Sequence, residues 1–298
     1  MWKNPSEYLA TNTVKYFARH KGEVNSCAVS PDCQLVITSS DDSRIHMWEA
    51  NSGLLKHKVT GHRGPVKSCC FSPDGSLFAS SSHDCTVRIW TVDTAECLHT
   101  LTDHCKSVET VCFSPDSKSI LSAGWDRLAI LWDVQTGEKL KSFNGHQDVI
   151  QCSTFSTDGL YIATGSWDYT VRLWSVGSDT NTNVLKGHKG NVSCVSFSVS
   201  GMLASGSWDK TICVWNPRNG FLIFLLNGHG DWLRTLSFSR DGILLASTGH
   251  DKMIRLWDCE HGKCIKVLKG MLEMAHTCTF SPNGTLLLAG AMGIYSSH

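Results

Sequence analysis

A His, a Ser or Thr, an Asp and a Trp recur as a set of four at nearly constant spacing in this 298-residue chain. Ser, His and Asp are the types that serve as nucleophile, base and orienting carboxylate in hydrolases. The set occurs six times, and successive Asp residues lie 42 positions apart, with one step of 41. The six sets are His20/Thr38/Asp42/Trp48, His62/Ser80/Asp84/Trp90, His104/Ser122/Asp126/Trp132, His146/Thr164/Asp168/Trp174, His188/Ser205/Asp209/Trp215 and His229/Ser247/Asp251/Trp257.

The number of copies argues against catalysis, because a catalytic triad needs one nucleophile in one cleft. In the structural interpretation the Asp lies at a tight turn and accepts the His N–H and backbone N–H groups. The His pairs with the Ser or Thr hydroxyl, and the hydroxyl accepts the Trp indole N–H, which can only donate. Every buried polar atom then has a partner, as a sheet interior requires. We therefore predict that the six His and six Asp residues are structural.

A period of about 40–45 residues is typical of a β-propeller, whose blades are four-stranded sheets around an axis. Within the second unit, alternating character and turn residues predict four short antiparallel strands. These strands are expected at residues 66–72, 77–81, 86–90 and 97–101. Because such a unit buries its faces only against its neighbours, we expect one domain over residues 13–298, preceded by a tail at 1–12.

The two ends of the chain predict a seventh blade that they share. Residues 13–19 match an outer strand, with Phe17 in the apolar position three before the His, and residues 275–280 and 286–290 match two inner strands. Closing the ring in this way hides sheet edges that would recruit other chains. In this last copy the set fails at Met271, Ala289 and Gly293. We expect an all-β, seven-bladed propeller with six complete repeats and a seventh blade that lacks a full third strand.

Composition and charge argue against several function classes. The 27 basic and 27 acidic residues balance, which removes the electrostatic argument for nucleic acid or an anionic membrane. The first eight residues lack the apolar core of a signal peptide, and the longest apolar run, 221–226, is too short to cross a bilayer. We expect an intracellular protein, cytoplasmic or nuclear, that binds neither nucleic acid nor membrane.

The fourteen cysteines include no C-x-x-C pair, so zinc and thioredoxin-type sites lack their usual spacing. We expect no metal site and no cofactor. Six cysteines recur six to eight residues after the His position, where a buried strand is expected and a free thiol packs as a small apolar side chain. These are Cys27, Cys69, Cys112, Cys152, Cys194 and Cys278. We predict reduced, buried thiols.

Over residues 13–298 the chain resembles the WD-repeat proteins. Gly-His stands at 61–62, 145–146, 187–188 and 228–229, and Trp-Asp at 132–133 and 257–258. The resemblance implies a rigid interaction platform without catalysis, monomeric itself and part of a larger assembly. Arg19 and Asp103 depart from Gly before the His, and the failing last copy puts ring closure in doubt.

In the WD-repeat family, the face that carries the His and Asp turns is the usual binding surface. The residue before each Asp, and those three and five after each His, point out there. At these positions we predict a partner site that consists of Trp125, Trp167, Trp208, Trp232, Arg234, His83, His250, Met274, His276, Glu23 and Glu109. Exposed Trp beside Arg is the composition of a binding hot spot. The alternative is that each ring packs on a neighbouring blade and only lines the rim.

The expected ligand is a protein or peptide segment whose basic side chain lies against a Trp face, flanked by Glu23 and Glu109. Two other functions compete with a scaffold. The run Trp215-Asn216-Pro217-Arg218 approaches the Trp-Asp-x-Arg motif of substrate receptors for cullin-type ubiquitin ligases, although Asn-Pro is also a common turn. An enzyme using the central channel would need an acid–base group outside the repeat, and the sequence offers no such group.

Overall fold

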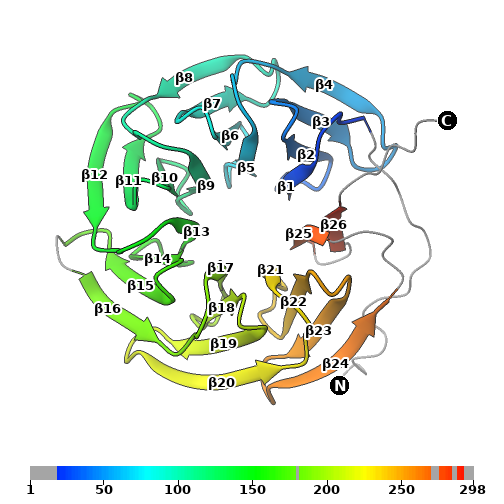
Figure 1. Ribbon diagram of the computed structural model, residues 1–298. Coiled ribbons are helices and arrows are strands. Elements are labelled where there is room, and N and C mark those ends of the chain that lie inside the picture. Colours follow the sequence, from blue (N-terminus) through cyan, green and yellow to red (C-terminus); the bar gives the residue numbers. More distant parts are fainter. Residues whose placement is uncertain (1–18, 179–180, 270–274, 284–286, 292–298) are drawn as a thin grey trace.

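The computed structural model describes residues 19–178, 181–269, 275–283 and 287–291 (Figure 1). They form six four-stranded antiparallel sheets, each in simple sequential order, and one two-stranded sheet. The six blades consist of β1 (Val24–Val29), β2 (Leu35–Ser40), β3 (Ile45–Glu49) and β4 (Leu55–Val59); β5 (Val66–Phe71), β6 (Leu77–Ser82), β7 (Val87–Thr91) and β8 (Cys97–Leu101); β9 (Val108–Phe113), β10 (Ser119–Gly124), β11 (Leu128–Asp133) and β12 (Lys139–Asn144); β13 (Ile150–Phe155), β14 (Tyr161–Ser166), β15 (Thr170–Ser175) and β16 (Asn181–Lys186); β17 (Val192–Phe197), β18 (Leu203–Ser207), β19 (Thr211–Asn216) and β20 (Phe221–Asn227); and β21 (Leu233–Phe238), β22 (Leu244–Gly249), β23 (Ile254–Asp258) and β24 (Lys263–Leu268).

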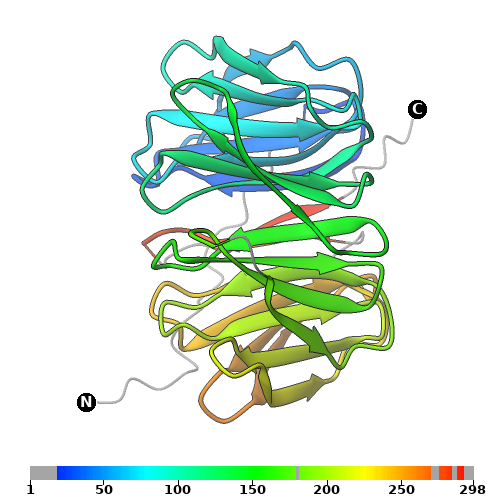
Figure 2. The same cartoon turned by 90° about the vertical axis from the view of Figure 1, so that its left-hand side faces the viewer.

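The blades stand around a central axis, with the first strand of each blade innermost and the fourth at the perimeter (Figure 1). Seen edge-on, the ring is a disc whose strands run across its thickness (Figure 2). The predicted all-β propeller with six complete repeats is confirmed.

The two-stranded sheet lies between the sixth blade and the first. Its strands are β25 (Ala275–Phe280) and β26 (Leu287–Ala291), which pair antiparallel. Strand β25 contacts both β21 and β1, and β26 contacts β1. Apart from Arg19, the predicted strand at 13–19 lies outside the described residues. Met271 and Gly293, two of the positions where the repeated set fails, lie outside them as well. A complete seventh blade therefore remains a prediction.

The core lies between the blades rather than within any one of them. Ile45 and Met47 of β3, for example, pack with Phe78 and Trp90 of the second blade. Trp90 is buried and stacks on Phe78, with ring centroids 6.0 Å apart. Each sheet is thus stabilised by its neighbours, as expected for repeats that bury their faces by stacking.

The turn after each second strand has the same geometry in all six blades. The Asp carboxylate accepts the backbone N–H two residues on, at 2.9–3.2 Å, which is an Asx turn. The residue directly after each Asp has φ of 60–72°, a left-handed conformation that this turn imposes on non-glycine residues. These residues are Ser43, Cys85, Arg127, Tyr169, Lys210 and Lys252. The residue before the Asp therefore lies at an equivalent point of every blade.

All fourteen cysteines are free, as predicted. Cys27, Cys69, Cys194 and Cys278 are buried, while Cys112 and Cys152 are half-buried. Burial raises the pKa of Cys27 to about 11 and that of Cys69 to about 12. The raised pKa values keep these thiols protonated at neutral pH, as expected for packing residues.

Candidate functional site

The four-residue sets form one hydrogen-bond chain in each blade. In the fourth blade the indole N–H of Trp174 donates to Thr164 Oγ1 at 2.9 Å, and Thr164 Oγ1 lies 2.8 Å from His146 Nε2. His146 Nδ1 in turn lies 2.8 Å from Asp168. Because the indole only donates and the carboxylate only accepts, the hydroxyl donates to Nε2 and Nδ1–H donates to the Asp. The other five sets repeat these contacts within 2.7–3.0 Å.

Burial differs between the His and the Asp of each set. The histidines are buried, whereas the aspartates are only half-buried. The histidines are His20, His62, His104, His146, His188 and His229, and the aspartates are Asp42, Asp84, Asp126, Asp168, Asp209 and Asp251. As predicted, each Asp lies in a turn, and its side chain is only 2–12% exposed.

The sixth blade illustrates this difference. The side chain of Asp251 is 11% exposed, against 1% for its partner His229, and their closest atoms are 2.8 Å apart. Asp251 also accepts the backbone N–H groups of Gly230 at 3.0 Å and Met253 at 3.1 Å. Partial exposure thus leaves the predicted contacts of this Asp in place.

Burial also competes with hydrogen bonding at the carboxylates. Burial alone would raise the pKa of Asp168, but the hydrogen bonds from His146 and Thr170 outweigh it and hold that pKa well below its usual range. The same balance lowers the pKa values of Asp84 and Asp209. The contacts expected of a structural set are therefore present, and every hydroxyl in the sets already has two partners.

Four of the predicted site tryptophans form a continuous aromatic row across the third to sixth blades. Ring centroids are 5.5 Å apart for Trp125 and Trp167, 5.6 Å for Trp167 and Trp208, and 4.4 Å for Trp208 and Trp232, which stack in parallel. His250 extends the row, 5.4 Å from Trp232. We call these five residues the tryptophan ladder.

Exposure along the ladder is greatest near its ends. Trp125 is 44% exposed and Trp232 is 41% exposed, whereas Trp167 and Trp208 are half-buried. The indole N–H of Trp167 also donates to Gln151 Oε1 at 3.1 Å. The rings do pack on one another, as the alternative interpretation predicted. Trp125 in the third blade and Trp232 in the sixth nevertheless remain exposed, with the half-buried rings of Trp167 and Trp208 between them.

Two predicted acidic residues act electrostatically on a third predicted site residue, Arg234. Burial lowers the pKa of Arg234, and the nearby carboxylates of Glu23 and Glu109 partly offset that effect. Glu109 also accepts a hydrogen bond from Ser107 at 2.7 Å and one from Gln151 at 3.4 Å. The acidic pair that was predicted to flank a ligand's basic side chain thus already acts electrostatically on Arg234 of this chain.

The remaining predicted site residues do not join either group. His83 is exposed on the second blade. Met274 lies outside the described residues, and for His276 the structure describes only the backbone, in β25.

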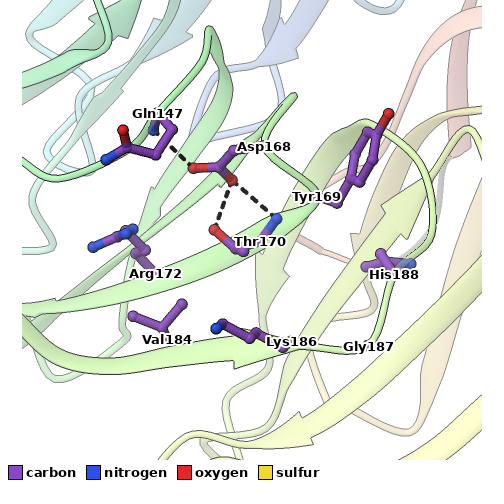
Figure 3. Close-up of a pocket in the computed structure, with 9 residues that line it drawn as sticks. All are labelled: Gln147, Asp168, Tyr169, Thr170, Arg172, Val184, Lys186, Gly187 and His188. Carbon is purple, nitrogen blue, oxygen red and sulfur yellow. Dashed lines mark hydrogen bonds between the residues drawn. The ribbon is translucent and has the colours of Figure 1, made fainter.

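A pocket of about 390 Å³ opens beside the fourth and fifth blades (Figure 3). Gln147, Asp168, Tyr169, Thr170, Arg172, Val184, Lys186, Gly187 and His188 line it. Asp168 is already held there by the N–H of Gln147 and by Thr170 (Figure 3). The Arg172 guanidinium lies 5.9 Å from the centroid of the Trp174 ring. The pocket walls therefore belong largely to the repeated framework.

The Trp215–Arg218 motif forms the turn that its Asn-Pro sequence predicts. Trp215 is buried in the framework, and Asn216 Oδ1 accepts the Arg218 N–H at 3.0 Å. Only Arg218 is exposed. A receptor role for this motif remains a prediction.

One candidate, His46 of β3, was not among the predicted site residues. It is buried and lies parallel to His20, with centroids 3.8 Å apart. The potential ligand atoms of His20, Asp42 and His46 all lie within 4.8 Å of one another. Placing the six units in register would have exposed this residue, because no other unit has a His at that position.

In the described part of the chain, no helix is long and apolar enough to span a bilayer.

Comparison with known proteins gives one family and two relatives. The model of the WD domain, G-beta repeat (WD40), matches residues 11–49, 53–91, 95–133, 137–175, 179–216 and 220–258. WD repeat-containing protein 38 of Homo sapiens is 51% identical over 53 residues, which are 18% of this chain and 17% of that protein. Its Mus musculus counterpart is also 51% identical over 53 residues, 18% of each chain. The match thus spans less than a fifth of either relative.

Proposed function

Because this chain belongs to the WD40 repeat family, we propose that it is a non-catalytic scaffold whose tryptophan ladder binds a peptide or protein segment. WD40 propellers generally serve as protein-interaction scaffolds. The observation that carries the finer proposal is the ladder itself, since clustered exposed aromatic rings are uncommon on a surface without a partner.

The geometry of the ladder favours binding in two ways. Trp125 and Trp232 offer large apolar faces, and Trp is among the residues that contribute most to binding energy. The contacts between rings also hold the side chains in place before a ligand arrives. Little conformational entropy is then lost on binding, and affinity rises accordingly.

The ligand we propose carries a Lys or Arg that lies on an exposed ring face near one end of the ladder. A cation over a Trp face contributes about 0.5–2 kcal/mol. Because the carboxylates of Glu23 and Glu109 already act electrostatically on Arg234, we expect the ring rather than the acidic pair to supply most of the attraction for the ligand's cation. Absence of catalysis, a monomeric state within a larger assembly and an intracellular location belong to the same proposal.

We also propose that both ends of the chain close the ring as a seventh blade. The first family match begins at residue 11, and the second, 42 residues on, begins at 53 just before β4. By this spacing residues 13–19 would form the outer strand of the seventh blade, and β25–β26 would provide its inner strands.

The function is tested with an array of Lys- and Arg-containing peptides and matched copies in which these residues are Gln. The Trp125→Ala and Trp232→Ala variants should each bind selected peptides at least tenfold more weakly, about 1.4 kcal/mol. Phe221→Ala removes an exposed aromatic ring from outer strand β20 and should bind normally. Unchanged affinity in both Trp variants, with unchanged melting, would exclude the ladder as the binding surface.

A further inference from the structure

One buried histidine breaks the pattern of the blades. His46 is 1% exposed, and neither ring nitrogen has a hydrogen-bond partner among the residues that the structure describes. At the same position the other five blades have Arg88, Ile130, Arg172, Cys213 and Arg255. Leaving a buried polar atom unpaired costs about 1–3 kcal/mol, so a buried imidazole without partners needs an explanation.

The neighbours of His46 are metal-binding types. His20 stacks on it, and His20 Nδ1 lies 3.0 and 3.2 Å from the two carboxylate oxygens of Asp42. Two imidazoles and a carboxylate are a common zinc donor set, completed by water as the fourth ligand. The three side chains come from the loop before β1, the turn after β2 and strand β3, so only the folded blade brings them together.

Asp42 also lacks a hydrogen bond that three of its five counterparts have; Asp126 and Asp251 lack it too. In the second, fourth and fifth blades a Thr hydroxyl donates to the equivalent Asp Oδ1 at 2.6–2.7 Å. The first blade has Arg44 at that position, and only its backbone N–H donates, at 3.1 Å. The Asp42 carboxylate therefore lacks the hydroxyl bond that fixes the other three, and it can turn an oxygen toward His46.

We propose that His20, Asp42 and His46 bind one divalent transition-metal ion of the zinc class. Metal–nitrogen bonds of about 2.0–2.1 Å require donor atoms roughly 3.4 Å apart, so the three groups must close in and the stacked rings must tilt. His46 can turn without losing a side-chain hydrogen bond to any described residue, because its ring makes none.

His20 must present the lone pair of Nδ1, so its proton moves to Nε2. The Nε2–H then donates to Thr38 Oγ1, which still accepts the indole N–H of Trp48 on its other lone pair. The Thr38 hydroxyl hydrogen turns away, and His20 loses no net proton. A hydrogen bond to the far nitrogen of a ligating His fixes the ring orientation, and Thr38 would provide it.

The test uses the full chain after removal of metal with a chelator. Titration with Zn²⁺ should show one bound equivalent and a raised melting temperature, since a ligand of the folded state stabilises it. His46→Ile places there the residue that the third blade already has at Ile130, so the fold should persist and melt at the same or a higher temperature without metal. This variant should bind Zn²⁺ about a hundredfold more weakly or not at all. His46→Arg introduces the residue type found at this position in three other blades, and it should weaken Zn²⁺ binding in the same way.

The matched control is His261→Ala, which removes an exposed His whose Nδ1 lies 2.8 Å from Asp258. It should bind Zn²⁺ like the original chain. The absorption spectrum of bound Co²⁺ then distinguishes imidazole and carboxylate ligands from thiolate ligands. This distinction is needed because fourteen free thiols compete for metal. Visible bands without intense near-ultraviolet thiolate bands support the site. The proposal is overturned if the thiolate bands dominate, if Zn²⁺ neither binds nor stabilises, or if both His46 variants bind it undiminished.

Discussion

Hydrogen bonds decide what the repeated His, hydroxyl and Asp side chains can do. In each blade the hydroxyl accepts from an indole and donates to an imidazole, and that imidazole donates to a carboxylate. In the fourth blade the chain runs from Trp174 through Thr164 and His146 to Asp168. The Asp168 carboxylate receives enough hydrogen bonds for its pKa to fall despite burial. The lowered pKa links the stability of the propeller to pH.

We predict that Asp168→Asn lowers the free energy of unfolding by about 1–3 kcal/mol at pH 7, as expected for losing hydrogen bonds to a charged group. The folded-state pKa of Asp168 lies below the unfolded value of about 3.9. Its contribution is therefore complete above that value and is lost as pH falls toward the folded pKa. Denaturant unfolding from pH 7 to pH 3 should show the variant and the original chain converging in acid.

The control is Asp93→Asn, which changes an exposed carboxylate and should alter unfolding little at any pH. A difference for Asp168→Asn that stays constant down to pH 3 would argue against the pH linkage.

The outer strands form the perimeter of the disc, and one of them is unusual. Strand β20 reads Phe-Leu-Ile-Phe-Leu-Leu-Asn, whereas β4, β12 and β24 each include Lys. Phe221, Leu222, Ile223 and Leu225 of β20 are all exposed. Edge strands of soluble proteins usually have charges that prevent pairing with other chains. We therefore expect this outer strand to be the surface at which the monomer self-associates at high concentration.

We predict that Leu225→Lys reduces concentration-dependent self-association, measured by sedimentation or light scattering. Leu225 pairs with Cys213 as Lys58 pairs with His46 in the first blade, so Lys is already accommodated at this register position. The free energy of unfolding should change by less than about 0.5 kcal/mol, as for most surface changes.

Thr100→Lys places the same charge at the same position of the second blade, where Thr100 pairs with Arg88, and should leave association unchanged. Equal association of Leu225→Lys and the original chain would show that β20 is not the contact.

The blades of a propeller stabilise one another around a ring, so the least stable blade limits the stability of the whole molecule. The two-stranded sheet β25–β26 contacts the first and sixth blades, and so connects the two ends of the series. If residues 13–19 complete that blade, removing them exposes apolar surface and opens the ring. The tail at 1–12 is outside the predicted domain, and its removal should change little.

We predict that deleting residues 1–18 destabilises the protein by at least roughly 2 kcal/mol, about the value of burying one large apolar side chain such as Phe17. Deleting residues 1–12 is the matched control. Hydrogen exchange should find the amides of β25 and β26 less protected than those of β17 and β18, and still less protected after the longer deletion. Identical exchange in both truncated chains would count against closure by the N-terminal residues.

The sequence by itself determined the repeat, and through it the six blades, the hydrogen-bonded sets and the positions of the ladder tryptophans. These follow from a period and from residue types, which act within one blade. Only the tertiary structure decided that Trp208 stacks on Trp232, and that Glu23 and Glu109 act electrostatically on Arg234. It also decided that His46 stacks on His20 with no hydrogen bond from its ring to the described residues. Such contacts depend on distances of a few ångströms between loops and blades, and a linear pattern gives the order of those elements without their separation.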